Sequence, residues 1–195
     1  MNPRARQIPV IVVTASRVPL AAAAAVLLVR GRMSGLEPWV VLCLLALIEA
    51  TDVFDGILAR RLGVAGLFGE LFDPYCDSIA RLLTYFGLAS AGLCPWWLVL
   101  LMAVRDVSVA YVRITLILSG RKAAARFSGK LKAIAQGAGG IALAAVFAIG
   151  PLAPRLELRR LSPIIAWLVA AATAWSLVDY SVAALRGKKT PPPVR

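Results

Sequence analysis

Long apolar stretches alternate along this chain with short connections that are rich in arginine, lysine, glycine and proline. A helix needs about 20 mainly apolar residues to cross a bilayer. Six stretches meet this requirement, at residues 8–29, 38–58, 72–93, 96–118, 131–149 and 164–185. The pattern predicts an all-α, polytopic membrane protein with six transmembrane helices. Residues 1–187 would form a single six-helix membrane domain, and residues 188–195 a disordered, basic, proline-rich tail.

The first apolar stretch is less regular than the others. Its interruptions are Pro9, Thr14, Ser16, Arg17 and Pro19. This pattern fits either one imperfect span or a short N-terminal interfacial helix that leads into a tilted span.

Composition supports the membrane assignment and narrows the chemistry. Of the 195 residues 60% are hydrophobic, and the formal net charge is +12. The basic residues lie between apolar segments rather than along one soluble face, so anionic lipids and phosphate-bearing substrates are better partners than nucleic acid. The chain has no histidine, and its three cysteines form no CxxC pair, which excludes zinc sites and histidine catalysis. Oxygen ligands and hard divalent cations remain.

The distribution of lysine and arginine predicts the orientation. If the N-terminus is cytoplasmic, the connections on that side carry most of the basic residues, as the positive-inside rule requires. An even number of spans then places both termini in the cytoplasm, and we expect a plasma membrane protein, of the bacterial inner membrane type. The acid-rich segment 52–77 falls at the same cytoplasmic face.

Segment 52–77 holds five of the ten acidic residues of the chain. Carboxylates cost about 2.5–3.5 kcal/mol each at membrane depth, so they indicate a functional site. Asp52 and Asp55 are three residues apart and Asp73 and Asp77 four apart, spacings that place each pair on one helix face. If the second and third spans are neighbours, four carboxylates face a common space. Two divalent cations would neutralise them and bind phosphate oxygens; Mg²⁺ is expected, with Mn²⁺ as the alternative.

A competing interpretation is a purely structural salt-bridge network. The acids would then pair with nearby basic residues, namely Arg60, Arg61, Arg81, Arg105 and Arg113. Salt bridges need no fixed spacing, however, and the spacing here is regular.

The segment matches D-x2-D-G-x2-A-R-x8-G-x3-D-x3-D at every fixed position, through Asp52, Asp55, Gly56, Ala59, Arg60, Gly69, Asp73 and Asp77. This pattern resembles the signature of the CDP-alcohol phosphotransferase (phosphatidyltransferase) family. The resemblance implies a six-helix membrane enzyme, usually a homodimer, that displaces CMP from a CDP-linked lipid such as CDP-diacylglycerol.

The resemblance also implies roles for individual residues. Asp52, Asp55, Asp73 and Asp77 would hold the two metals, and Asp77 would also act as the catalytic base on the acceptor hydroxyl. A further set would line the CDP-lipid site, consisting of Gly56, Ala59, Arg60, Gly66 and Gly69, with Thr14 and Arg17 approaching the nucleotide from the first span.

Basic residues elsewhere suggest the acceptor. Arg105 and Arg113 are eight residues apart and share a helix face, and Lys130 and Lys132 open the fifth span. Together with Gln136 and the segment WSLVDY at 175–180, they resemble phosphatidylglycerophosphate synthases within the family. That resemblance implies a small phosphorylated alcohol, glycerol 3-phosphate, as acceptor. Ser78 and Ala133 depart from it, since that group usually has Lys and Thr there.

Two alternatives stay open at this stage. One is the same chemistry with another acceptor, namely serine, inositol phosphate or phosphatidylglycerol. The other belongs to a different class, a cation transporter or channel that uses the acids as an ion path; the absence of an evident internal repeat weakens it.

Overall fold

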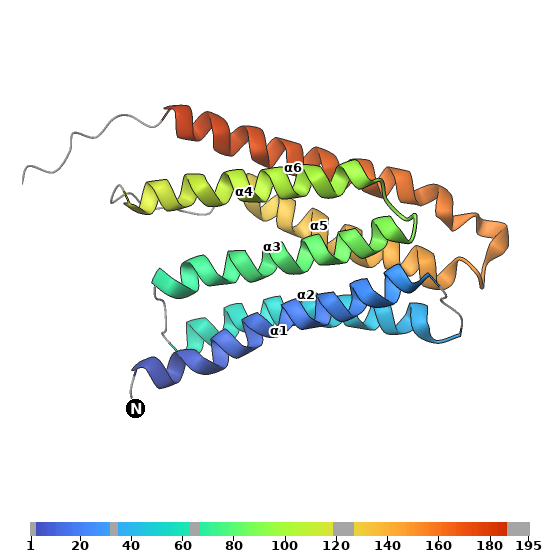
Figure 1. Ribbon diagram of the computed structural model, residues 1–195, viewed down its shortest axis with the longest axis horizontal. Helices are drawn as coiled ribbons and strands as arrows, with labels where there is room; N and C mark the ends of the chain where they lie inside the picture. Colours follow the sequence, from blue (N-terminus) through green and yellow to red (C-terminus); the bar gives the residue numbers. More distant parts are fainter. Residues whose placement is uncertain (1–2, 32–34, 63–66, 119–126, 187–195) are drawn as a thin grey trace, which may run out of the picture.

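The computed structural model describes residues 3–31, 35–62, 67–118 and 127–186, and it contains six long helices (Figure 1). They are α1 (Pro3–Arg30), α2 (Glu37–Leu62), α3 (Leu67–Ser90), α4 (Trp96–Leu118), α5 (Phe127–Ile149) and α6 (Leu161–Arg186). Two short 3-10 helices, η1 (Pro154–Leu156) and η2 (Leu158–Arg160), connect α5 to α6. The predicted all-α class is confirmed, while the proposed tail at 188–195 lies outside the described residues.

The first span is one helix in the structure. α1 continues through both Pro9 and Pro19, so no separate interfacial helix precedes it among the described residues. Proline removes one backbone donor and crowds the preceding turn, yet the helix persists because its second half is packed into the core. Ala21, Ala24 and Leu28 of α1 are almost completely buried.

Consecutive helices run in opposite directions, which brings alternate helix ends together (Figure 1). The start of α1, the end of α2, the start of α3, the end of α4, the start of α5 and the end of α6 all lie at one end of the bundle. The second half of α2 carries Asp52, and the first half of α3 carries Asp73 and Asp77. The up-and-down topology therefore places residues distant in sequence at the same end.

The second and third spans are neighbours, as expected, but in the described residues they touch through side chains, with Arg81 of α3 2.9 Å from Glu49 of α2. In the described residues α1 packs closely against both α2 and α3, whereas α2 and α3 are not a closely packed pair. A close approach of α1 to α3 is possible because Gly87 has no side chain: a Cβ there would lie 2.9 Å from the Cα of Ala25. The two acid-bearing helices thus both lie against α1, and they also contact one another through Arg81 of α3 and Glu49 of α2.

Within the described residues three segments are long and apolar enough to cross a membrane, Ile11–Arg30, Phe127–Ile149 and Pro154–Ala184. In the part of the chain that the structure describes, the other three long helices, α2, α3 and α4, do not reach this combination of length and hydropathy. Their charged residues include Glu49 and Asp52, Asp77 and Arg81, and Arg105 and Asp106. Six spans therefore stay a prediction.

Candidate active site

Arg17 of α1 lies among three of the predicted acids. Its guanidinium nitrogens are 2.9 Å from Asp52, 3.4 Å from Asp73 and 3.9 Å from Asp77. The Arg17 side chain is only 1% exposed, while the carboxylates of Asp52 and Asp73 are about half exposed. A buried cation on α1 thus joins the acids of α2 and α3, and the acids face outward.

A second arginine supports the same cluster from behind. Arg81 lies one helical turn after Asp77 on α3, and its Nε donates to both carboxylate oxygens of Asp77 at 3.2 and 3.3 Å. Its other nitrogens reach Glu49 of α2. The salt-bridge interpretation is therefore correct for Arg81 and Asp77, although Arg17, which it did not include, makes most of the ion pairs.

Several predicted residues cannot be placed in this cluster. The side chains of Asp55, Gly56, Ala59, Arg60 and Gly69 lie outside the described residues, as does the whole of Gly66. Thr14 is buried one turn before Arg17 on α1. The predicted nucleotide contacts of Thr14 and Arg17 stay predictions, since here Arg17 contacts the carboxylates.

The acids fit a hard divalent cation in their chemistry, because they offer only oxygen ligands. In this arrangement the guanidinium of Arg17 provides the positive charge that a metal would bring. Among the described residues no three acidic or cysteine side chains form a group that could hold a metal ion. The described set is incomplete for this purpose, because it lacks the Asp55 carboxylate.

A second charged cluster connects α4, α5 and α6. Asp106 accepts a hydrogen bond from Arg105 at 2.7 Å and lies 2.9 Å from the amine of Lys132. Arg105 also donates to Ser176 at 2.7 Å, and its guanidinium lies 5.5 Å from the centre of the Tyr180 ring. All three charged side chains are nearly fully buried. Arg105 is therefore held rigidly by contacts from two helices.

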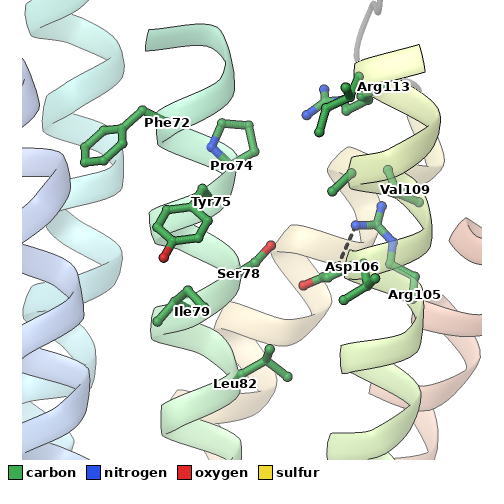
Figure 2. A pocket seen from close by; sticks show the side chains of 13 residues that line it. Phe72, Pro74, Tyr75, Ser78, Ile79, Leu82, Arg105, Asp106, Val109 and Arg113 are labelled. Atoms are coloured by element: carbon green, nitrogen blue, oxygen red, sulfur yellow. Dashed lines mark hydrogen bonds and ion pairs between the residues drawn. The ribbon is translucent and has the colours of Figure 1, made fainter. Parts of the chain in front are cut away.

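A cavity of about 530 Å³ separates α3 from α4 (Figure 2). Its wall is mostly apolar, with Tyr75 and Ile79 on α3, and its polar lining includes Ser78, Arg105, Asp106 and Arg113. In Figure 2 the side chains of Ser78 and Asp106 point toward one another across the cavity. Asp77 precedes Ser78, so the cavity and the acid cluster lie on adjacent faces of α3.

The four predicted acceptor residues fall in different environments. Arg105 and Arg113 line the cavity, as their shared helix face predicts. Within the described part of the chain, the buried Nε of Arg113 has no hydrogen-bond partner. Lys130 is exposed at the start of α5. Lys132 is buried against Asp106 and is not part of the cavity lining.

Glu49 and Ser176 were not among the predicted site residues. Glu49 precedes Asp52 by three residues, so the helical spacing used for the other acids provides a signal for it. Ser176 lies in the segment 175–180, which resembles phosphatidylglycerophosphate synthases, but its contact with Arg105 depends on the packing of α4 against α6.

Comparison with known proteins identifies the family of this chain. A family model described as CDP-alcohol phosphatidyltransferase matches residues 7–177. The chain belongs to the CDP-alcohol phosphatidyltransferase family. The match covers all six long helices at least in part, and it confirms the resemblance drawn from the acid motif.

Curated members of the family resemble parts of the chain. A probable phosphatidylglycerophosphate synthase of Mycobacterium tuberculosis is 38% identical over 86 residues, which are 44% of this chain and 41% of that protein. A CDP-diacylglycerol–glycerol-3-phosphate 3-phosphatidyltransferase of Bacillus subtilis is 33% identical over 88 residues, 45% of this chain and 46% of that protein. A protein of that same name from Yersinia pestis is 27% identical over 75% of this chain and 79% of its own. The two more similar matches thus span less than half of each relative.

Proposed function

We propose that this protein transfers the phosphatidyl group of CDP-diacylglycerol to sn-glycerol 3-phosphate, giving phosphatidylglycerophosphate and CMP. The observation that carries the proposal is the joint position of two features at one end of the bundle. Acids of α2 and α3 gather around Arg17, and a cavity lined by Arg105 and Arg113 lies on the next face of α3. Family membership and the names of the relatives support the same reaction.

The reaction is an in-line displacement at phosphorus. The acceptor hydroxyl oxygen forms a bond to the phosphorus that carries the diacylglycerol, the bond from this phosphorus to the oxygen of CMP breaks, and CMP leaves with that oxygen. Asp77 accepts the hydroxyl proton as the general base. Such transfers depend mainly on positioning and charge neutralisation, and they need no serine or cysteine nucleophile.

Two Mg²⁺ ions, or Mn²⁺ in their place, would be held by Asp52, Asp55, Asp73 and Asp77. When bound, they would stabilise the negative charge on the phosphates and on departing CMP. Arg17 would then release the carboxylates and turn to the nucleotide phosphates. We assign Thr14, Gly56, Ala59, Arg60, Gly66 and Gly69 to the CDP-lipid site on the family motif.

On the acceptor side, the guanidinium groups of Arg105 and Arg113 would bind the phosphate of glycerol 3-phosphate. Arginine suits this role because its planar fork matches phosphate oxygens. Lys130 would attract the anionic acceptor from the aqueous side. Lys132 would act indirectly. It shares the carboxylate of Asp106 with Arg105, so this carboxylate does not fully neutralise the positive charge of the Arg105 guanidinium.

We also propose that the active end faces the cytoplasm of a plasma membrane and that the protein works as a homodimer. Soluble glycerol 3-phosphate is available on that side, and the basic connections there follow the positive-inside rule. The cation-transporter alternative is not supported by the family, which is named for a transferase.

The test is a CMP-release assay with purified protein, CDP-diacylglycerol and Mg²⁺. Glycerol 3-phosphate, serine, inositol phosphate and phosphatidylglycerol are offered separately, with a no-acceptor control. We expect CMP release with glycerol 3-phosphate. If CMP is released with serine, inositol phosphate or phosphatidylglycerol instead, the proposed acceptor is wrong while the proposed type of reaction stands. No release with any acceptor would refute the proposed enzyme activity.

A further inference from the structure

Arg81 is shared between two carboxylates from different helices. Its Nε faces both oxygens of Asp77, while Nη1 and Nη2 lie 2.9 and 3.4 Å from the two oxygens of Glu49. The Arg81 side chain is 6% exposed and the Glu49 side chain 30% exposed. A planar guanidinium can contact two carboxylates along two edges at once, which the single ammonium of lysine cannot do in the same geometry.

Glu49 in turn is confined by α5. Its carboxylate lies against the backbone of Gly137, and a Cβ built at Gly137 would overlap the carboxylate atoms. The residual cavity at this junction of α2, α3 and α5 has a volume of only about 10 Å³. That is at the lower limit for a single water molecule. On the side that faces α5, Glu49 therefore has little space to turn away from Arg81.

The arrangement has consequences for the charge and orientation of Asp77. Glu49 and Arg81 neutralise one another, so the negative charge of Asp77 is left to act on the side of Arg17 and the substrate. Glu49 also fixes the rotation of the guanidinium, because Arg81 can satisfy both acids only when its Nε edge faces Asp77. An Arg81 without Glu49 would be free to make a closer, differently oriented contact with Asp77.

We infer that Glu49 is a positioning residue for Asp77 that acts through Arg81, and that Gly137 supplies the space this requires. The inference rests on the proposed function, in which Asp77 is the general base. Glu49 reaches Asp77 only through Arg81, and Gly137 faces Glu49, so we expect the effect to fall on the orientation of Asp77 and not on substrate binding.

The inference predicts a specific kinetic change. Partners that orient a functional ligand typically contribute 10–100-fold, so Glu49→Gln should lower kcat by about 10–100-fold. KM for CDP-diacylglycerol and for the acceptor should stay within about twofold. Glutamine has the shape of glutamate and leaves one oxygen for Arg81, so this variant should fold even if Glu49→Ala does not.

A double-mutant cycle separates positioning from ordinary packing. Gly137→Ala should lower kcat by about 10-fold or more in the native background, because the added methyl displaces the Glu49 carboxylate. In the Glu49→Ala background the same change should have no further effect, since the displaced group is gone. Gly140→Ala is the matched control on α5: a Cβ there meets its nearest neighbour, Tyr85, at an ordinary 3.7 Å. It should leave kcat unchanged in both backgrounds.

The result that supports the inference is a fall in kcat at unchanged KM together with non-additivity at positions 49 and 137, in proteins of normal melting temperature. If Gly137→Ala lowers kcat equally in both backgrounds, or if Glu49→Gln has native kcat, the inference is wrong while the proposed function stands. If the native protein releases no CMP with any acceptor, the proposed function fails and Glu49 has no base to position.

Discussion

The two charged clusters at the active end of the bundle are built in opposite ways. Around α1–α3 the cations are buried and the acids face out: Arg17 is 1% exposed, while Asp52 and Asp73 are 45% and 53% exposed. Around α4–α6 every partner is buried, with Arg105, Asp106 and Lys132 exposed by 9%, 4% and 4%. The same residue types therefore present opposite charges to a ligand.

The difference follows from the ratio of acidic to basic side chains in each cluster and from how deeply these side chains are buried. In the described part of the first cluster, two arginines face four carboxylates, so negative charge remains and lies where a divalent cation can reach it. In the second cluster two cations, Arg105 and Lys132, contact the same carboxylate of Asp106, and the Arg105 guanidinium lines the cavity. We therefore expect metal and CDP-lipid at the first cluster and the acceptor phosphate at the second.

The largest expected effect comes from the anionic cluster. Asp77→Asn should lower kcat by about 10²–10⁴-fold, the usual contribution of a general base, because an amide cannot accept the hydroxyl proton. CDP-diacylglycerol binding should change little. Steady-state CMP release, together with a lipid-binding titration, measures both quantities. Near-native kcat would remove Asp77 as the base.

Asp106→Asn should have the largest effect on stability. It leaves the buried Arg105 and Lys132 without a carboxylate, and breaking a buried ion pair in this way costs about 3–5 kcal/mol. The double variant Asp106→Asn with Lys132→Met should recover part of the loss, because one uncompensated cation is removed. Thermal unfolding in detergent distinguishes the two variants. Equal melting temperatures of the single and the double variant would show that the buried Lys132 ammonium does not need the Asp106 carboxylate for stability.

Arg17→Ala should destabilise the protein less, by about 1.5–3 kcal/mol, the usual value for hydrogen bonds to charged groups. The carboxylates that it leaves are partly solvated, which limits the cost. Mg²⁺ should raise the melting temperature of Arg17→Ala more than that of the native protein, since a divalent cation can replace the lost positive charge. An equal response of both proteins to Mg²⁺ would contradict a shared position for guanidinium and metal.

Arg113→Gln should affect the acceptor side alone. We expect an increase of about 10-fold in KM for glycerol 3-phosphate, which corresponds to about 1.4 kcal/mol, with KM for CDP-diacylglycerol unchanged. Initial rates at varied concentrations of each substrate provide the comparison. If only KM for CDP-diacylglycerol changed, the roles assigned to the two clusters would have to be exchanged.

The smallest effect is expected at an exposed ion pair far from both clusters. Arg160 and Glu157 pair across the connection between α5 and α6, with side chains 81% and 55% exposed. Such pairs contribute about 0–1 kcal/mol, so Arg160→Ala should leave kcat and both KM values unchanged. It serves as the charge-loss control for the arginine variants above.

Much of this organisation follows from local pattern. The apolar stretches predict the helices, because burial in lipid or core needs a continuous apolar length, although α2 extends to Leu62 beyond its predicted end at 58. The predicted span ends inside the charged motif, which begins at Asp52, whereas the helix continues to Leu62. The shared face of Arg105 and Arg113 follows from helical spacing and is confirmed by the cavity.

Contacts between helices were harder to predict. The pairing of Arg17 with Asp52 and Asp73 depends on α1 lying against both α2 and α3, and no local pattern specifies that packing. The same holds for Lys132, whose partner Asp106 is 26 residues away on another helix. Arg17 and Lys132 were both expected to bind ligands. In the structure both side chains are buried and pair with carboxylates.

We propose that the outward-facing carboxylates exchange the Arg17 guanidinium for divalent metal when the CDP-lipid binds. The most direct measurement is a crystal structure of the protein with CDP-diacylglycerol and Mn²⁺, in which anomalous scattering locates the metal. The account predicts Mn²⁺ within bonding distance of Asp52, Asp73 and Asp77, with Arg17 withdrawn toward the nucleotide phosphates. Bound CDP-lipid with no Mn²⁺ at these carboxylates, and Arg17 still paired with them, would contradict it.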